Sequence, residues 1–166
     1  ILFKNKITLR NISFSYRNNT KKVLDKFNLE IFKGERIGII GPSGGGKSTL
    51  GDILMGLLEP TEGVLEIDGV ELHKNDKFSK NDWYKNISHV PQDIFLIDGT
   101  VAENIAFGLP YNKIDKKKLM QVIHASRLSN VIKNIDDAFL TIVGERGSKL
   151  SGGQRQRIGI ARALYK

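Results

Sequence analysis

The sequence predicts an α/β fold in which an antiparallel sheet, a strand with a glycine-rich loop and a helix, and a helical region follow one another. Three observations support this prediction. Near the N-terminus apolar residues alternate with polar ones, as in half-buried strands. A short apolar run then leads into a glycine-rich loop and a segment with helical spacing. In the second half of the chain, apolar residues recur every three or four positions, which indicates helices.

The first predicted elements are two antiparallel strands. Residues 7–16 and 24–31 alternate in polarity and are separated by the polar residues 17–22. Residues 36–40 form a short, mostly apolar run that ends at a glycine-rich loop. Such a run is typical of a strand buried on both faces, so we predict a buried strand there.

A helix is predicted for residues 47–58. Apolar side chains lie at helical spacing in this segment, and it ends before Pro60. Gly51 and Gly56 lower the helix propensity without removing the pattern.

A hairpin and a further strand follow this helix. Residues 64–67 and 70–72 read as two short strands joined by Asp68-Gly69, a dipeptide that favours a type I′ turn. Residues 87–90 form another short apolar run. We predict a strand there as well.

The remaining segments predict a helical subdomain. Helix-compatible spacing covers residues 101–107, 116–126 and 128–134, with a break at Pro110. The last segment, residues 151–166, opens with serine and two glycines and continues with apolar residues on one helical face. We therefore divide the chain into three parts: residues 1–90, 91–150 and 151–166.

Composition limits the class of protein. The 166 residues are 40% hydrophobic, which is enough for one buried core, and the chain is expected to be one domain or part of one. No apolar run approaches the ~18 to 20 residues needed to cross a bilayer. The chain has no cysteine, so a disulfide framework and a thiolate metal site are excluded.

The chain carries a formal net charge of +8. This charge favours anionic partners in general. Its lysines are scattered or occur in short runs such as Lys116-Lys117-Lys118, which is more typical of a solvated helix face than of a nucleic-acid interface. We expect no nucleic-acid partner.

One segment matches the phosphate-binding pattern G-x-x-x-x-G-K-[ST] between a predicted strand and a predicted helix. Glycines let the backbone direct its N–H groups at phosphate oxygens, and the helix N-terminus adds its dipole. Lys47 is expected to neutralise the β and γ phosphates, Ser48 to offer its hydroxyl to Mg²⁺ and Thr49 to act near the α phosphate. The alternative is a glycine-rich loop with an incidental lysine. The predicted nucleotide-binding residues are Gly41, Pro42, Ser43, Gly44, Gly45, Gly46, Lys47, Ser48 and Thr49.

A second glycine cluster precedes the last predicted helix, in the string Leu150-Ser151-Gly152-Gly153-Gln154. It is a second anion-accepting helix N-terminus, this time without a lysine. An ordinary serine N-cap is the alternative interpretation.

With these two motifs in this order, the chain resembles the ATP-binding cassette family over essentially all 166 residues. The resemblance implies a P-loop NTPase core with an antiparallel β subdomain and a helical signature subdomain. It implies ATP and Mg²⁺ as cofactors and a head-to-tail pair of cassettes. In that pair Ser151, Gly152, Gly153 and Gln154 contact the ATP held by the partner, which makes a second cassette a partner of this chain.

Two further positions match the family pattern. Tyr16, after the first strand, corresponds to the aromatic residue that stacks on adenine, and a strand-end tyrosine is the alternative. Gln92 corresponds to the Q-loop glutamine, whose oxygen approaches Mg²⁺ and the attacking water. The resemblance thus implies that Lys47 and Gln92 act in catalysis and that Ser48 and Gln92 lie at the metal.

Two segments resemble exporter-type cassettes that are fused to a membrane domain. One runs from Asp98 to Ile105, and the other, Gly144-Glu145-Arg146-Gly147, resembles the X-loop. In such exporters the X-loop region meets coupling helices of the membrane domain, so Glu145 and Arg146 are candidates for that contact. A surface ion pair is the alternative. The location implied is the cytoplasmic face of a membrane.

The acidic strand of the family's Walker B motif, with its Mg²⁺-binding aspartate and catalytic glutamate, is expected after the signature helix, beyond Lys166. Residues 64–68 and 139–143 do not fit as substitutes. The switch histidine is expected there too, and His73, His89 and His124 read as ordinary residues. We therefore expect the parent protein to be the ATPase and this segment alone to be inactive.

The resemblance implies that the parent protein couples ATP binding and hydrolysis to transport across a membrane. Two other functions remain open. One is a soluble cassette ATPase acting on nucleic acid or ribosomes, and the other is a nucleotide-binding module that does not hydrolyse ATP.

Overall fold

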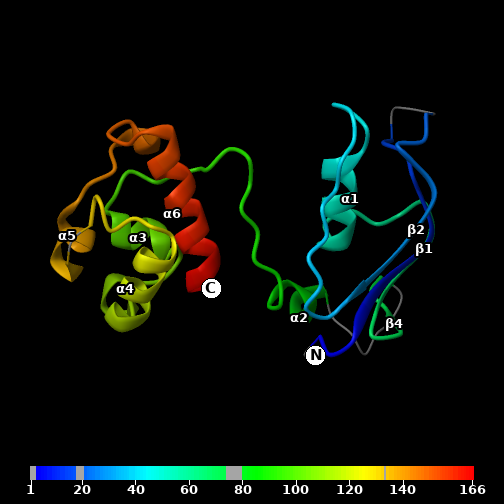
Figure 1. Ribbon diagram of the computed structural model, residues 1–166, viewed down its shortest axis with the longest axis horizontal. Coiled ribbons are helices and arrows are strands. Elements are labelled where there is room, and N and C mark those ends of the chain that lie inside the picture. Colours follow the sequence, from blue (N-terminus) through cyan, green and yellow to red (C-terminus); the bar gives the residue numbers. More distant parts are fainter. Residues whose placement is uncertain (1–2, 18–20, 74–79, 133) are drawn as a thin grey trace. The chain divides into compact units, whose positions relative to one another are not determined.

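The computed structural model describes the chain apart from residues 1–2, 18–20, 74–79 and 133, and it divides into two compact units. The first unit is Ile1–Ile87 and the second is Ser88–Lys166 (Figure 1). The division into residues 1–90, 91–150 and 151–166 stays a prediction.

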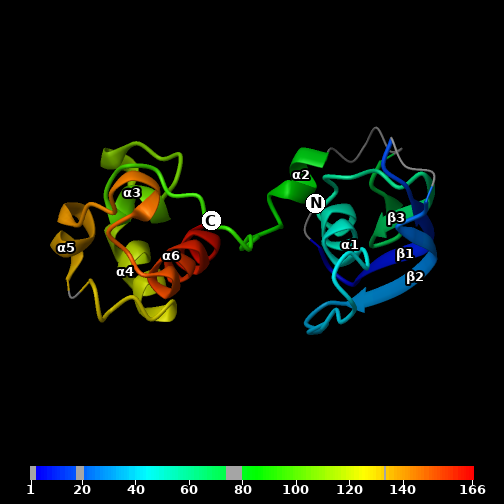
Figure 2. The ribbon, with the colours of Figure 1, turned by 90° about the horizontal axis from the view of Figure 1, so that it is seen from above.

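The first unit contains a four-stranded antiparallel sheet in the order β2-β1-β3-β4, with helix α1 beside it (Figure 2). Strands β1 and β2 pair from Lys6↔Phe32 to Phe14↔Leu24, which confirms the two predicted strands. The elements of this unit are β1 (Lys6–Phe14), β2 (Leu24–Phe32), α1 (Lys47–Leu54), β3 (Glu62–Ile67), β4 (Val70–Glu71) and α2 (Lys80–Tyr84).

The predicted hairpin is also confirmed. Strands β3 and β4 pair at Ile67↔Val70, and both turn residues have positive φ, 51° for Asp68 and 81° for Gly69. These angles suit a type I′ turn. The Asp68 carboxylate accepts hydrogen bonds from the backbone N–H groups of residues 4–6, which ties the turn to the start of β1.

One face of the sheet packs against α1, which contributes Leu50 and Ile53 to the core of this unit. The indole N–H of Trp83 in α2 donates to the carbonyl of Leu54 at 3.0 Å. Helix α1 ends at Leu54, four residues earlier than predicted, because Gly56 adopts φ 76° and the N–H of Leu57 turns back to the carbonyl of Asp52.

Two predicted strands are wrong as secondary structure. Residues 36–40 and 87–90 contain no strand, and the sheet of the described residues has no place for them beside β1 to β4. The Ile40 side chain is 97% exposed. An apolar run forms a strand only when another strand satisfies its backbone, and no described segment does so here.

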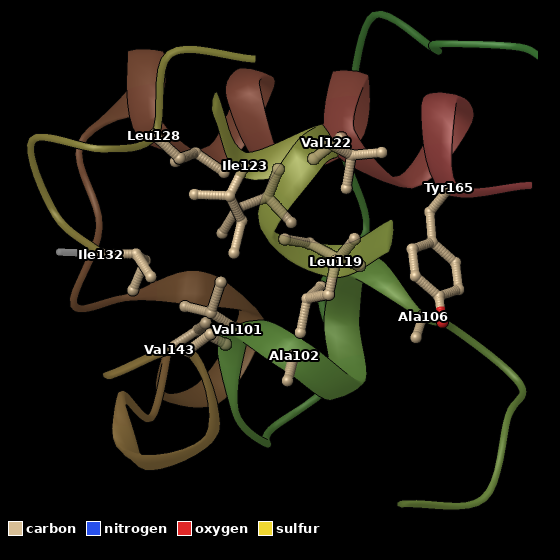
Figure 3. Packing of buried hydrophobic residues seen from close by; sticks show 14 of the residues in the cluster. Val101, Ala102, Ala106, Leu119, Val122, Ile123, Leu128, Ile132, Val143 and Tyr165 are labelled. Carbon is tan, nitrogen blue, oxygen red and sulfur yellow. The ribbon is translucent and has the colours of Figure 1, made fainter. Parts of the chain in front are cut away.

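The second unit is helical, with α3 to α6 around a single apolar core (Figure 3). Leu119 and Ile123 of α4 and Val101 and Ala102 of α3 belong to this core. The elements are α3 (Val101–Ile105), α4 (Lys116–Ala125), α5 (Ile135–Leu140) and α6 (Gly152–Tyr165), with short 3₁₀ helices η1 (Tyr111–Lys113) and η2 (Glu145–Gly147).

Three of the predicted helices are confirmed as α3, α4 and α6, and the one over residues 128–134 is wrong. Only a turn forms after Leu128, and residue 133 lies outside the described residues. Helix α5 begins instead at Ile135, because Asn134 caps it by accepting from the N–H of Asp137 at 2.9 Å. Within the described part of the chain, no helix is both long and apolar enough to cross a membrane.

Candidate functional site

The glycine-rich loop before α1 is curled by two left-handed glycines. Gly44 has φ 75° and Gly46 has φ 84°, and the N–H of Gly45 donates to the carbonyl of Pro42 at 3.1 Å. A Cβ at Gly46 would lie 3.1 Å from the side chain of Val23, so both the conformation and the space favour glycine. No side chain caps α1, which leaves its first N–H groups for another acceptor.

Lys47 folds back over this loop. Its Nζ donates to the carbonyl oxygens of Gly41 at 2.9 Å and Pro42 at 2.6 Å. Ser43 and Ser48 are exposed, and Thr49 is buried. The ammonium group thus lies against the carbonyls that precede the glycine cluster, and a glycine-lined loop before an uncapped helix N-terminus is a feature that favours anions.

Tyr16 is brought to the same helix. Its hydroxyl shares a hydrogen bond of 3.0 Å with Oγ1 of Thr49, and its ring meets Phe14 edge to face at 5.0 Å. The ring is 46% exposed. It presents a half-exposed aromatic surface next to the phosphate-binding loop, which is compatible with both interpretations of Tyr16.

The signature segment forms a capped N-terminus on α6. Ser151 Oγ accepts from the N–H of Gln154 at 3.3 Å, and Gln154 Oε1 accepts from the N–H of Ser151 at 2.8 Å. Gly152 and Gly153 are exposed, and a Cβ at Gly153 would have no neighbour within 4 Å. The fold itself therefore does not require a glycine at 153.

Arg155 holds the signature segment from behind. Its Nη1 donates to the carbonyl of Leu150 at 2.9 Å and approaches that of Gly147 at 3.5 Å. Gly147 has φ 75°, and a Cβ there would lie 2.6 Å from Leu96. The tight approach of η2 and α6 thus depends on Gly147.

The sequence analysis missed a buried polar network centred on Asn104. The Asn104 side chain is completely buried, donates to the carbonyls of Ile97 and Thr100, and accepts from the N–H of Ile97 at 3.0 Å. Arg162 of α6 donates to the carbonyls of Asn104 at 2.8 Å and Phe95 at 3.0 Å. Burial lowers the pKa of Arg162 from its ordinary value.

This network joins the segment after Gln92 to the signature helix, through residues 95–104. A signal was present in the sequence, because Asn104 is a polar residue inside an apolar helical stripe. Gln92 is exposed in the second unit, whereas Lys47 and Ser48 belong to the first. Its approach to the metal remains a prediction.

Glu145 and Arg146 lie in η2, and both are exposed. Arg146 has φ 49°, and the structure records no ion pair between these two described residues. The nearby strand-like bridge Thr100↔Ile142 links η2 to the start of α3. A pocket of about 600 Å³ is lined there by Asp98, Gly99, Thr100, Glu103, Ile142, Gly144, Glu145, Ser148 and Lys149.

Among the described residues, no group of three or more His, Cys, Asp or Glu side chains could hold a metal ion. His89 and His124 are exposed, and the His73 side chain is buried near Glu59 with a pKa lowered by burial. The two rejected acidic segments lie in the β3–β4 hairpin and across the end of α5, so neither is the buried strand that the motif needs.

The family model for the ABC transporter matches residues 24–166, so this chain belongs to the ABC transporter family. It is a nucleotide-binding domain of exporter type, and the P-loop fold follows from that family. A solved structure of a bacterial Atm1-family ABC exporter with ATP bound has a TM-score of 0.86 and 32% identity, covering 99% of this chain and 28% of that one.

Curated relatives give the same result. The chain is 39% identical to an ATP-dependent lipid A-core flippase of Cupriavidus metallidurans, covering 94% of this chain and 26% of the relative. It is 41% identical to the chloroplastic ABC transporter B family member 29 of Arabidopsis thaliana, covering 96% and 25%. It is 42% identical to the ABC multidrug transporter mdr2 of Aspergillus fumigatus, covering 96% and 20%. The chain thus spans about a quarter or less of these relatives.

Proposed function

We propose that this chain is the ATP-binding part of a membrane exporter in which two cassettes pair head to tail and couple ATP binding and hydrolysis to transport. The observation that carries the proposal is a pair of anion-accepting helix N-termini, those of α1 and α6, in two different units of one chain. A single nucleotide needs one such cradle. A second one has a role when it faces the nucleotide of another cassette.

The first cradle has the residues that ATP requires. The N–H groups of Gly44, Gly46 and Lys47 and the Lys47 ammonium would bind phosphate oxygens, and the half-exposed Tyr16 would stack on the adenine. Bound ATP supplies the phosphoanhydride: its binding drives the two cassettes together, and its cleavage releases them. Ser48, with its exposed hydroxyl, is the Mg²⁺ ligand in this proposal, and Gln92 is the second.

The second cradle supplies its groups to the partner cassette. Ser151 and Gly153 would bind the γ phosphate of the partner's ATP, and Gly152 and Gln154 shape this contact. The open space around Gly153 supports this role, because a close external contact explains a glycine that the fold does not need.

The residues that face the membrane domain are proposed to be Glu145 and Arg146 of η2. Their exposure and their connection to α3 through Thr100 support this assignment. The parent protein would then lie with this domain at the cytoplasmic face. The relatives support export in general, since their names include a lipid A-core flippase and a multidrug transporter.

Hydrolysis also needs a Mg²⁺-binding aspartate and a glutamate that activates water, and neither is found at the described cradle. We propose that this 166-residue segment alone is inactive and that the full-length protein is the ATPase.

Steady-state hydrolysis of ATP tests the proposal. In the full-length protein, Lys47→Ala should lower Mg²⁺-dependent turnover by at least about a hundredfold, because the phosphate charge loses its fixed counter-charge. Lys33→Ala is the matched control, since Lys33 is exposed in the same unit and outside the loop. The proposal would be contradicted if the Lys47→Ala protein hydrolysed ATP as fast as the unmodified full-length protein, or if the 166-residue segment alone did so.

A further inference from the structure

The second unit contains a basic pocket that no part of the nucleotide site uses. Its volume is about 390 Å³, and it is lined by His124, Arg127, Ser129, Asn130 and Arg157. All five side chains are polar, and every one of them can donate a hydrogen bond. The pocket lies where the end of α4 and the loop after it meet the second turn of α6.

The walls of the basic pocket are held by hydrogen bonds. Arg157 Nη1 donates to the carbonyl of Arg127 at 3.0 Å, which uses one of its five donors. His124 Nδ1 and Ser129 Oγ lie 3.2 Å apart and share a hydrogen bond. These contacts fix Arg157 and the loop after α4, while the remaining guanidinium donors stay available.

No acidic side chain belongs to the elements that form the pocket. Residues 116–134 contain five basic residues and no Asp or Glu, and residues 147–166 also contain five basic residues and no Asp or Glu. For Arg127 and Arg157 no ion pair is recorded with any described residue. Two guanidinium groups at one concave site without a carboxylate attract an oxyanion.

The backbone at Arg127 gives an independent indication. Arg127 follows the C-cap of α4 with φ 57°, a left-handed conformation in which glycine or asparagine is the usual residue. An arginine here costs conformational energy that a glycine would not. Strained backbone conformations of this kind occur at functional sites, and a function of the Arg127 side chain in the basic pocket would explain why an arginine is present here.

We propose that the basic pocket binds the phosphate group of a small ligand. Arginine guanidinium groups bind phosphate oxygens through paired N–H donors, and Ser129 and Asn130, which also line the pocket, add neutral donors. The volume suits a phosphorylated small molecule rather than a bare ion alone. This site is separate from the signature cradle, the N-terminus of α6 at residues 151–154, because Arg157 lies six residues beyond Ser151 along α6.

Tripolyphosphate binding, measured by calorimetry on the full-length protein, tests this assignment. A Lys47→Ala background weakens the phosphate-binding loop and leaves the basic pocket intact. In that background, Arg127→Asn should raise the dissociation constant at least about tenfold, because it removes charge-assisted hydrogen bonds. Asparagine tolerates the left-handed backbone, so the melting temperature should stay the same or rise.

Lys26→Asn in the same background is the matched control. Lys26 is exposed, has φ 46° and lies in the first unit, so the substitution removes one charge at the same backbone conformation. It should leave tripolyphosphate binding unchanged. If Arg127→Asn and Lys26→Asn bind equally, or if Lys47→Ala alone abolishes binding, the basic pocket is not a phosphate site.

A phosphate group can come from a soluble molecule or from a lipid headgroup, and nanodiscs separate these sources. Tripolyphosphate binding is compared in nanodiscs of phosphatidylcholine alone and in nanodiscs that also contain phosphatidic acid. If phosphatidic acid weakens tripolyphosphate binding, and Arg127→Asn removes this weakening, the ligand is a lipid headgroup. If tripolyphosphate binds equally in both kinds of nanodisc and Arg127→Asn weakens it in both, the ligand is soluble. If Arg127→Asn changes tripolyphosphate binding in neither, the proposal is overturned.

Discussion

The two units each place a glycine-rich loop before a helix, yet the two loops are held in different ways. In the second unit, α6 is capped by its own Ser151 and Gln154 and fixed from behind by Arg155. In the first unit, α1 has no side-chain cap, and Lys47 donates to the carbonyls of its own loop. The N-terminus of α6 is therefore capped by residues of its own unit, whereas the first N–H groups of α1 have no side-chain partner.

The segments that precede the two loops differ in the same way. Leu150, before the signature, is 8% exposed, and Ile40, before the phosphate loop, is 97% exposed. Leu150 packs into a core that the helices of its own unit complete, whereas residues 36–40 need neighbouring strands that no described segment supplies. The signature segment is thus capped by bonds within a few residues and packed by helices of its own unit, whereas the residues before the phosphate loop have no partner strand among the described residues.

The largest effect is expected at Asn104, which holds the second unit together. Asn104→Leu removes four hydrogen bonds of a completely buried side chain and takes away the partner of both the N–H and the carbonyl of Ile97. The free energy of unfolding should fall by about 3 kcal/mol or more. Urea unfolding, monitored by hydrogen exchange in α3 and α6, measures this loss.

Asn28→Ala is the control in the first unit. The Asn28 side chain also makes hydrogen bonds, to Asn11 and the carbonyl of Lys26, but it is exposed, and water can replace the lost partners. Its removal should cost less than about 1 kcal/mol. Equal losses for Asn104→Leu and Asn28→Ala would show that the buried network does not hold the second unit.

A medium effect is expected at the β3–β4 turn of the first unit. Burial opposes ionisation of Asp68, but the N–H groups of Lys4, Lys6 and Asn5 outweigh it and lower the pKa of Asp68. Asp68→Asn keeps the left-handed turn and removes the charge, and should cost about 1 kcal/mol at pH 7, since the site is partly exposed and water screens the charge. Thermal unfolding across pH measures this difference.

The sign of the pH dependence follows from the lowered pKa. The Asp68 carboxylate stabilises the folded state above the ordinary carboxyl pKa of about 4, and this contribution is lost as the pH falls through the lower folded pKa. The gap between wild type and Asp68→Asn should therefore narrow in acid and close below that value. A constant gap from pH 7 to pH 2 would assign the effect to hydrogen-bond geometry and not to charge.

Much of the fold could be predicted from the sequence because the relevant forces are local. Alternation identified β1 and β2, Asp68-Gly69 identified the hairpin, and the serine with two glycines identified the start of α6. The two wrong strands share one cause. Both segments are apolar runs, but a strand forms only where another strand pairs with it, and sequence periodicity gives no information on that pairing.

The candidate site divides in the same manner. The glycine turn before α1 and the serine cap of α6 could be predicted from motif spacing, and the roles of their residues at a nucleotide stay predictions. Asn104 could be noticed as a polar residue inside an apolar stripe, but its pairing with Arg162 could not be predicted, because 58 residues separate the two. Arg127 was passed over because its significance lies in its backbone conformation.

The smallest effect on stability is expected at Gly153 of the signature cradle. Gly153→Ala places a methyl group where nothing lies within 4 Å, and alanine favours helices more than glycine does. The free energy of unfolding should therefore change by no more than about 0.5 kcal/mol, in either direction. ATP turnover of the full-length protein should nevertheless fall at least about tenfold, because the methyl group blocks a close approach of the partner's phosphate. A fall in both stability and turnover would mean that Gly153 serves the fold, and unchanged turnover would remove the signature cradle from the proposed two-cassette site.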